Sequence, residues 1–196
     1  MNLLVEAIGG PAVPPLRLLP PAAADLLVML GAPPRLGAHL RAVHDVAWRL
    51  TGWLAGAYPA LEFDRPAVLF GAATHDIGKV THPQELSGPG SRHEQAGRRL
   101  LLQAGVAPRL ARFAASHGSW DSPTVEIEDL LVSVADKVWK AKRVPDLEQL
   151  LIERLVAVCG QEPWAVFLAL DTELDELAAG ADGRLAYQNG FPVDVR

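Results

Sequence analysis

Cysteine is nearly absent from this sequence of 196 residues, which contains only Cys159. A single cysteine cannot form a disulfide within the chain, so nothing calls for an oxidising compartment. Long apolar runs are missing too, because none approaches the roughly 18 residues that a membrane span needs. Residues 1–20 also lack the basic start and the cleavage pattern of a secretory signal. We therefore expect a cytoplasmic protein that does not cross a membrane.

The sequence also lacks clusters of basic residues. The chain has 18 Lys and Arg against 23 Asp and Glu, which gives a net charge of -5. Proteins that bind duplex nucleic acid usually gather their cations on one face. No such gathering is visible, so we exclude duplex nucleic acid as a partner. A few local cations are still enough to bind a small anionic ligand.

A third absence is the two-residue alternation of apolar and polar side chains, and we therefore expect no strands. Apolar residues instead recur at steps of three and four, as in Leu36, Leu40 and Val43, which is typical of amphipathic helices. Prolines and glycines divide the chain into helices expected over residues 22–30, 35–57, 64–76, 92–104, 108–117, 147–158 and 163–185, with a further one that starts at Ser122-Pro123 and carries Ile127 to Val138. The proline-rich first third is expected to be loosely built.

The length and the composition are those of one globular domain. Apolar residues make up 49% of the chain and charged residues 21%, the balance of an ordinary folded protein. A chain of this length can bury one substantial core but hardly two.

Titratable side chains interrupt the apolar faces of the expected helices. They are His39, His75, His93, His117 and Asp136, with Asp76 directly after His75. Burying an imidazole or an ionised carboxylate without a partner is costly. If the helices pack so that these residues converge, the side chains become ligands of one or two divalent metals.

The order of these residues resembles that of a known family, the HD-domain metal-dependent phosphohydrolases. A first histidine, a His-Asp-Ile-Gly-Lys string at residues 75–79, two more histidines and a distant aspartate follow in the family's order. The resemblance covers about residues 34–143, in the segments PRLGAHLRAVHDVAWRL, GAATHDIGKV, SRHEQAGRRLLLQAG, ARFAASHG and LLVSVADKVWK. A His-Asp pair alone is a weak signal, since His44-Asp45 is a second one, but six ordered positions are specific.

The resemblance implies a single all-α helical bundle with extra helices at both ends. Its core would be residues 34–143, preceded by a proline-rich segment with a short helix (1–33) and followed by C-terminal helices packed on the core (144–196). The implied metal ligands are His39, His75, Asp76, His93, His117 and Asp136, with Asp76 bridging two ions. Iron or manganese suits a histidine-rich set better than magnesium does, and nickel, cobalt or zinc is compatible with it.

The resemblance also implies catalytic and substrate-binding roles. Asp76 and Lys79 would be catalytic, with Lys79 meeting a phosphate oxygen. Arg92, Lys137 and His44 are further candidates for substrate contacts. The implied reaction is hydrolysis of a phosphomonoester or phosphodiester by a metal-activated water.

The identity of the first ligand has two candidates. His39 and His44 lie on one helix and point about 140 degrees apart, so both cannot easily bind the same metal. The residues that follow His39, Val43 and Ala47 among them, fit the family's pattern better than the residues that follow His44. The number of residues between the first ligand and His75, however, is compatible with His44 as well. We favour His39, and expect His44 to face the cavity as a supporting or substrate-contacting group.

The expected substrate is a small phosphorylated molecule, in particular a nucleotide. The string Gly-Tyr-Pro, which marks the cyclic-dinucleotide branch of the family, does not follow the motif, which argues against such substrates. Two other functions stay open: a di-iron oxygenase of the same superfamily, and a catalytically silent sensor of a nucleotide or metal. A homodimer is compatible with each of them.

Overall fold

The computed structural model describes residues 2–193 and is all-α, with no strand in that range. The all-α prediction is therefore confirmed. The helices are α1 (Leu3–Gly9), α2 (Pro21–Met29), α3 (Pro34–Ala57), α4 (Arg65–Ala72), α5 (Arg92–Gln103), α6 (Pro108–Ala111), α7 (Phe113–Ser116), α8 (Ile127–Val138), α9 (Pro145–Cys159), α10 (Pro163–Ala179) and α11 (Ala181–Asn189), with 3-10 turns η1 (Ile77–Val80) and η2 (Pro83–Leu86). Met1 of the predicted N-terminal segment and residues 194–196 of the C-terminal one lie outside the described residues.

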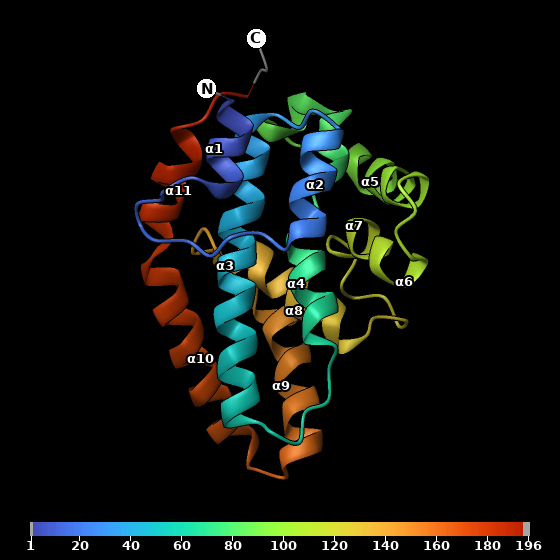
Figure 1. Cartoon of the computed structure of the whole chain (residues 1–196). Coiled ribbons are helices and arrows are strands. Elements are labelled where there is room, and N and C mark those ends of the chain that lie inside the picture. Colours follow the sequence, from blue (N-terminus) through green and yellow to red (C-terminus); the bar gives the residue numbers. More distant parts are fainter. Residues whose placement is uncertain (1, 194–196) are drawn as a thin grey trace.

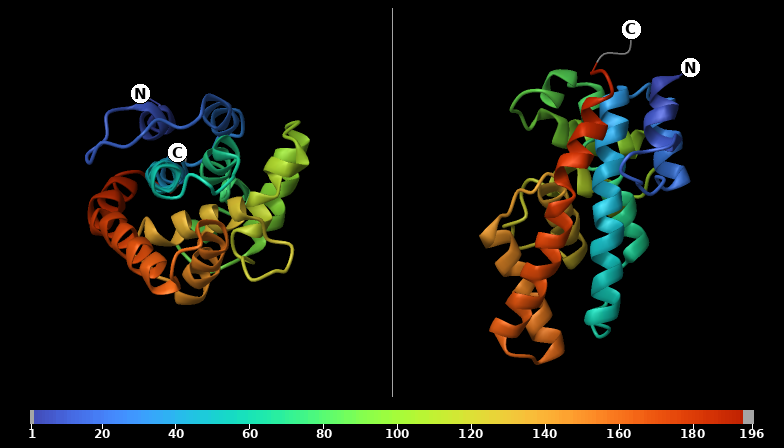
Figure 2. Two further views of the ribbon diagram at one scale, coloured as in Figure 1. Left: turned by 90° about the horizontal axis from the view of Figure 1, so that it is seen from below. Right: turned by 90° about the vertical axis from the view of Figure 1, so that its left-hand side faces the viewer.

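The long helix α3 forms the centre of the bundle (Figure 1). It contacts α1, α4, α8, α10 and α11. The helices α1 and α2 cover one side of α3 and α4, while α8 and α9 lie on the other (Figure 2). Because α3 is surrounded, polar residues as well as apolar ones on it are buried.

The first third of the chain is more ordered than its prolines suggest. Asn2 caps α1 by accepting a hydrogen bond from the backbone N–H of Leu4 at 3.0 Å. Leu4, Ala7 and Ile8 on α1 are then buried, and α1 packs on α3. The expectation of loosely built packing was wrong here, because a short helix with one apolar face is stabilised by the helix beneath it.

The predicted helix over residues 64–76 ends earlier, at Ala72. The backbone then winds more tightly: Thr74 N donates to Gly71 O at 3.0 Å, and Lys79 N donates to Asp76 O at 2.9 Å. The turn continues into η1, which packs against α5. His75 and Asp76 therefore lie in the turn after α4 rather than in its last helical turn.

Gly78 is what allows η1 to approach α5 so closely. A Cβ atom at Gly78 would overlap the backbone carbonyl oxygen of His93 and lie 2.5 Å from the backbone nitrogen of Gly97. Only a residue without a side chain fits between the two backbones. The glycine of the His-Asp-Ile-Gly-Lys string thus places Asp76 and His93 side by side.

Three other helix boundaries differ from the predictions. The helix expected from Ser122-Pro123 begins at Ile127, because Glu126 and Asp129 form a reciprocal capping box. The helix expected over 163–185 is interrupted at Gly180, where a Cβ atom would lie 2.7 Å from the Nη1 of Arg184. The one expected over 108–117 is divided at Arg112, whose carbonyl accepts a three-residue hydrogen bond from Ala115 N at 2.8 Å.

Within residues 2–193, no helix combines the length and the apolar character that crossing a membrane requires.

Candidate metal centre

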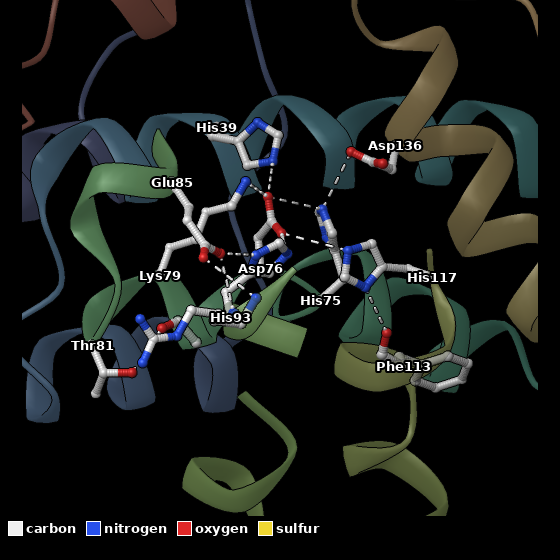
Figure 3. Close-up of polar contacts among 12 residues, drawn as sticks. His39, His75, Asp76, Lys79, Thr81, Glu85, His93, Phe113, His117 and Asp136 are labelled. Atoms are coloured by element: carbon white, nitrogen blue, oxygen red, sulfur yellow. Dashed lines mark hydrogen bonds and ion pairs between the residues drawn. The ribbon is translucent and has the colours of Figure 1, made fainter. Parts of the chain in front are cut away.

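Six buried side chains from five parts of the fold meet at one point (Figure 3). They come from α3 (His39), the turn after α4 (His75 and Asp76), the first turn of α5 (His93), the end of α7 (His117) and α8 (Asp136). None of the six residues is more than 7% exposed. Their potential ligand atoms form two groups, His39 with His75 and Asp136, and Asp76 with His93 and His117, in each of which the atoms lie within 4.8 Å of one another.

Asp76 belongs to the second group, but its two carboxylate oxygens face different groups. Its Oδ2 is 3.0 Å from the Nε2 of His39 and 3.6 Å from the Nε2 of His75. Its Oδ1 is 2.9 Å from the Nε2 of His93 and 3.6 Å from the Nε2 of His117. Asp136 completes the first group, with Oδ1 at 3.4 Å from His75 Nε2. This is the arrangement that a carboxylate shared by two cations requires.

The four imidazoles are oriented by contacts on their outer sides. The Nδ1 atom of each ring lies within hydrogen-bond distance of an acceptor outside the centre: His39 with Gln188 Oε1 at 3.2 Å, His75 with Ala72 O at 3.0 Å, His93 with Glu85 Oε2 at 2.6 Å, and His117 with Phe113 O at 3.2 Å. When Nδ1 carries the proton and donates it, the lone pair of Nε2 points inward. Histidines that bind metals are commonly held in this way.

Within residues 2–193, three of the four inward-facing nitrogens lack hydrogen-bond partners. Among the residues that the structure describes, the buried Nε2 atoms of His39, His75 and His93 make no hydrogen bond of acceptable geometry. Unpartnered buried polar atoms are costly and uncommon. Four imidazole nitrogens and two carboxylates suit a divalent transition metal. The residues present therefore fit such an ion.

Burial and neighbouring charges keep two of the histidines and both carboxylates in the protonation states that bind metals. Burial lowers the pKa of His39, and it lowers the pKa of His117 to about 4, so both rings are neutral at neutral pH. Burial alone would raise the pKa of Asp76 and Asp136, but interactions with His75 and with a neighbouring lysine, Lys79 or Lys137, lower both pKa values. The carboxylates are therefore ionised.

His93 differs from the other histidines in having a raised pKa. Burial disfavours its charged form, but contacts with Asp76 and Glu85 on its two nitrogens outweigh burial and raise the pKa. Glu85 also accepts hydrogen bonds from the backbone nitrogens of Arg92, at 3.3 Å, and His93, at 3.1 Å. The carboxylate of Glu85 thus fixes both the ring of His93 and the start of α5.

Two lysines neutralise the carboxylates. Lys79 Nζ is 2.6 Å from Asp76 Oδ2, and Lys137 Nζ is 2.6 Å from Asp136 Oδ2. Both side chains are mostly buried, 16% and 20% exposed. Of the predicted substrate contacts, these two lie at the centre, and Arg92 lies next to His93 with an exposed side chain.

His44 lies away from the other candidates. It is buried, and burial together with Arg17 and Arg41 lowers its pKa to about 4. In the described part of the chain, neither the ion pairs nor the ligand groups of the centre include His44. The structure brings His39 to Asp76 and gives no support to a cavity-facing His44, because the two side chains point in different directions from α3.

A cavity of about 510 Å³ opens beside the centre. Its lining residues are His39, Lys79 and Glu85 from the centre, Leu86, Ser87, Gly88 and Pro89 after η2, Trp139 and Lys140 after α8, and Leu185 and Gln188 from α11. Both cations and apolar side chains face this space. It is large enough for a small organic ligand.

Neither Glu85 nor Gln188 could be predicted as part of the site from the sequence. Glu85 lies in a polar loop that has no helical periodicity, and Gln188 lies near the end of the chain, 149 residues from His39. The family's motif also includes neither residue. Their contacts depend on the tertiary packing of η2 and α11.

A comparison of the chain with models of protein families identifies the family to which it belongs. The family model of the HD domain matches residues 38–139, just over half of the chain. The chain belongs to the HD domain family. The HD match contains all six residues of the centre and ends at Trp139, before α9, α10 and α11. Comparisons with curated proteins and with solved structures gave no match. Membership of the HD domain family and the two His/Asp groups together suggest divalent metal binding.

Proposed function

We propose that this HD-domain protein is a metal-dependent phosphohydrolase that cleaves a phosphomonoester or phosphodiester, in particular of a nucleotide. The observation that carries the proposal is the position of Asp76, which offers one carboxylate oxygen to each of two buried groups of imidazole ligands. A carboxylate shared in this way is suited to two adjacent ions, which can act together on the attacking and leaving oxygens of a phosphate ester.

The proposed ligands divide between two ions. His39, His75 and Asp136 would hold one ion, His93 and His117 the other, and Asp76 both. Bound divalent metal supplies Lewis acidity and a water acidified to near neutral pKa. We propose iron or manganese, because imidazole nitrogen is a poorer ligand for magnesium.

The protein's own residues would bind and orient the substrate. Lys79 is the cation at the boundary between the centre and the cavity, where it can meet a phosphate oxygen. Lys137 would hold Asp136 in its orientation through their 2.6 Å contact. Leu86, Trp139 and Leu185 give the cavity apolar surface for the remainder of the substrate. This combination of a phosphate-binding end and an apolar wall supports the proposal that the substrate is a nucleotide.

The test is a phosphate-release assay on the full chain. Protein stripped with a chelator and reloaded with Mn(II) or Fe(II) is incubated with a panel of nucleoside monophosphates, oligophosphates and phosphodiesters. We expect release of phosphate or nucleotide that depends on the metal and is lost in Asp76→Asn and in His75→Gln. The matched control is His82→Gln, a half-buried histidine outside both ligand groups of the centre, and it should retain activity.

The alternatives give different outcomes in the same assay. Product that requires oxygen and appears without hydrolysis of a phosphate ester would support a di-iron oxygenase instead. Tight nucleotide binding without turnover under any metal would support a silent sensor. Either result would contradict the proposed hydrolase.

A further inference from the structure

We infer that Gln188 on α11 is a positioning residue for the metal ligand His39, so that the C-terminal helix completes a centre whose ligands all lie in the HD domain. The inference rests on the proposed metal centre. It assigns a role to a helix that lies beyond the residues matched by the family, 38–139.

His39 needs an acceptor from outside its own helix. His75 and His117 contact backbone carbonyls three and four residues earlier, and His93 contacts Glu85 eight residues earlier. His39 lies in the first turns of the long helix α3, where the nearby carbonyls are engaged in helical hydrogen bonds. The acceptor for its Nδ1 is instead the amide oxygen of Gln188, at 3.2 Å.

This contact determines which nitrogen of His39 faces the centre. An amide oxygen can only accept, so it favours the tautomer in which Nδ1 carries the proton. The buried Nε2, 3.0 Å from Asp76 Oδ2 and without a hydrogen bond in residues 2–193, is then a lone-pair donor directed inward. Without the acceptor, the ring can rotate or change tautomer, and it becomes a weaker ligand.

The structure holds α11 firmly enough for this role. Tyr187 donates from its hydroxyl to Ala7 O at 2.6 Å and accepts from Arg41 Nη1 at 3.0 Å. The Nε of Arg35, on α3, donates to Phe191 O at 2.9 Å. The buried Arg184 donates from Nε to Trp139 O at 2.8 Å. These contacts fix the residues on both sides of Gln188.

The same region joins the centre to the cavity wall. Trp139 packs against the ring of His39 with centroids 4.8 Å apart, and both line the cavity together with Gln188. A displacement of α11 would therefore affect both His39 and the proposed substrate site. The effect on the metal can nevertheless be measured without substrate.

The test measures metal affinity and the tautomer of His39 in the full chain. Mn(II) binding is followed by equilibrium dialysis with elemental analysis, and the ring nitrogens of the metal-free protein are observed by 15N NMR. Gln188→Leu removes the acceptor, Gln188→Glu retains it, and Asn189→Leu removes an exposed amide one residue away. We expect Gln188→Leu to bind at least one Mn(II) about tenfold more weakly. We also expect it to lose the Nδ1–H tautomer of His39.

The outcomes separate this inference from the proposed function. Gln188→Glu should restore the affinity and Asn189→Leu should match the wild type, with similar thermal unfolding in all four proteins. If the wild type binds Mn(II) and Gln188→Leu binds it equally well with an unchanged tautomer, the role of Gln188 is wrong and the proposed function stands. If Gln188→Leu binds weakly but Gln188→Glu fails to restore the affinity, the positioning role is overturned. If the wild type binds no metal, both proposals fail.

Discussion

At the scale of single residues, the four histidines of the centre share one arrangement. Each has an acceptor near its outer nitrogen and leaves its inner nitrogen directed at Asp76 or Asp136. Burial lowers the pKa of His39 and His117, so these rings can accept a metal at neutral pH without first releasing a proton. A cation bound among these groups would offset the cost of burying them.

The role of Lys79 can be tested by removing its charge. Lys79→Met leaves the metal ligands in place but takes away the cation 2.6 Å from Asp76 that lines the cavity. We expect kcat/KM for a phosphate ester to fall about 100-fold, the cost of losing one preorganised contact to developing charge. Affinity for Mn(II) should be retained or increased, since a competing cation is removed. The exposed Lys142→Met is the control, and equal kcat/KM in both variants would refute the role.

The lowered pKa of His44 predicts that the stability of the protein depends on pH through a group outside the metal centre. Its pKa is 6.5 in the unfolded chain and about 4 in the folded protein, because it is buried beside Arg17 and Arg41. Between these values only the unfolded chain binds the proton, so the free energy of unfolding decreases as the pH falls from 6.5 to 4. For one group the decrease from pH 8 to pH 5 is about 2 kcal/mol.

Urea unfolding of the metal-free protein at pH 8 and pH 5 measures this effect. In His44→Leu the pH-dependent loss of stability should be smaller than in the wild type by about 2 kcal/mol. The comparison between the two proteins cancels the contributions of the other histidines. An identical loss in both would show that His44 does not titrate as the structure indicates.

At the scale of elements, the helix pattern was predictable where apolar periodicity is strong. The ranges expected for α2, α3, α5 and α9 agree with the structure to within two residues. The predicted helix boundaries were wrong where side-chain or close backbone contacts determine where a helix begins or ends, as at the capping box of Glu126 and at Gly180 beside Arg184. Such contacts override the local signals of proline and glycine, on which the predictions depended.

Gly78 provides a test of how η1 is placed against α5. In Gly78→Ala the new methyl group overlaps the His93 carbonyl, so η1 must move away from α5 and carry Asp76 with it. We expect a loss of about 1–3 kcal/mol in the free energy of unfolding, typical of overpacking. Metal affinity should weaken as well. Thermal and chemical unfolding measure the first effect and equilibrium dialysis the second.

The control for Gly78 is Gly56 in the last turn of α3, where an added Cβ meets no atom within 4 Å. Gly56→Ala should leave stability unchanged or raise it by up to about 1 kcal/mol, since alanine is the better helix former. If both substitutions were equally harmless, the close contact of η1 with α5 would not be a constraint.

At the scale of the whole molecule, the HD domain supplies the six residues of the candidate centre, while other segments contact and enclose them. The family resemblance indicated all six residues of the centre, and the structure brings them together. It could not indicate Gln188, because an acceptor 149 residues from His39 leaves no periodic or motif signal in the sequence. The choice of His39 over His44 likewise depended on which face of α3 turns toward Asp76, and the sequence left that alternative open.

The central claim is that Asp76 bridges two metal ions in a buried centre. Anomalous diffraction from crystals of Mn(II)- or Fe(II)-loaded protein, combined with elemental analysis, tests it most directly because it gives the identity, number and ligands of the ions together. We expect two peaks, one bound by His39, His75 and Asp136 and the other by His93 and His117, with an oxygen of Asp76 on each. A fully loaded protein in which no metal contacts His75 or Asp76 would contradict the claim.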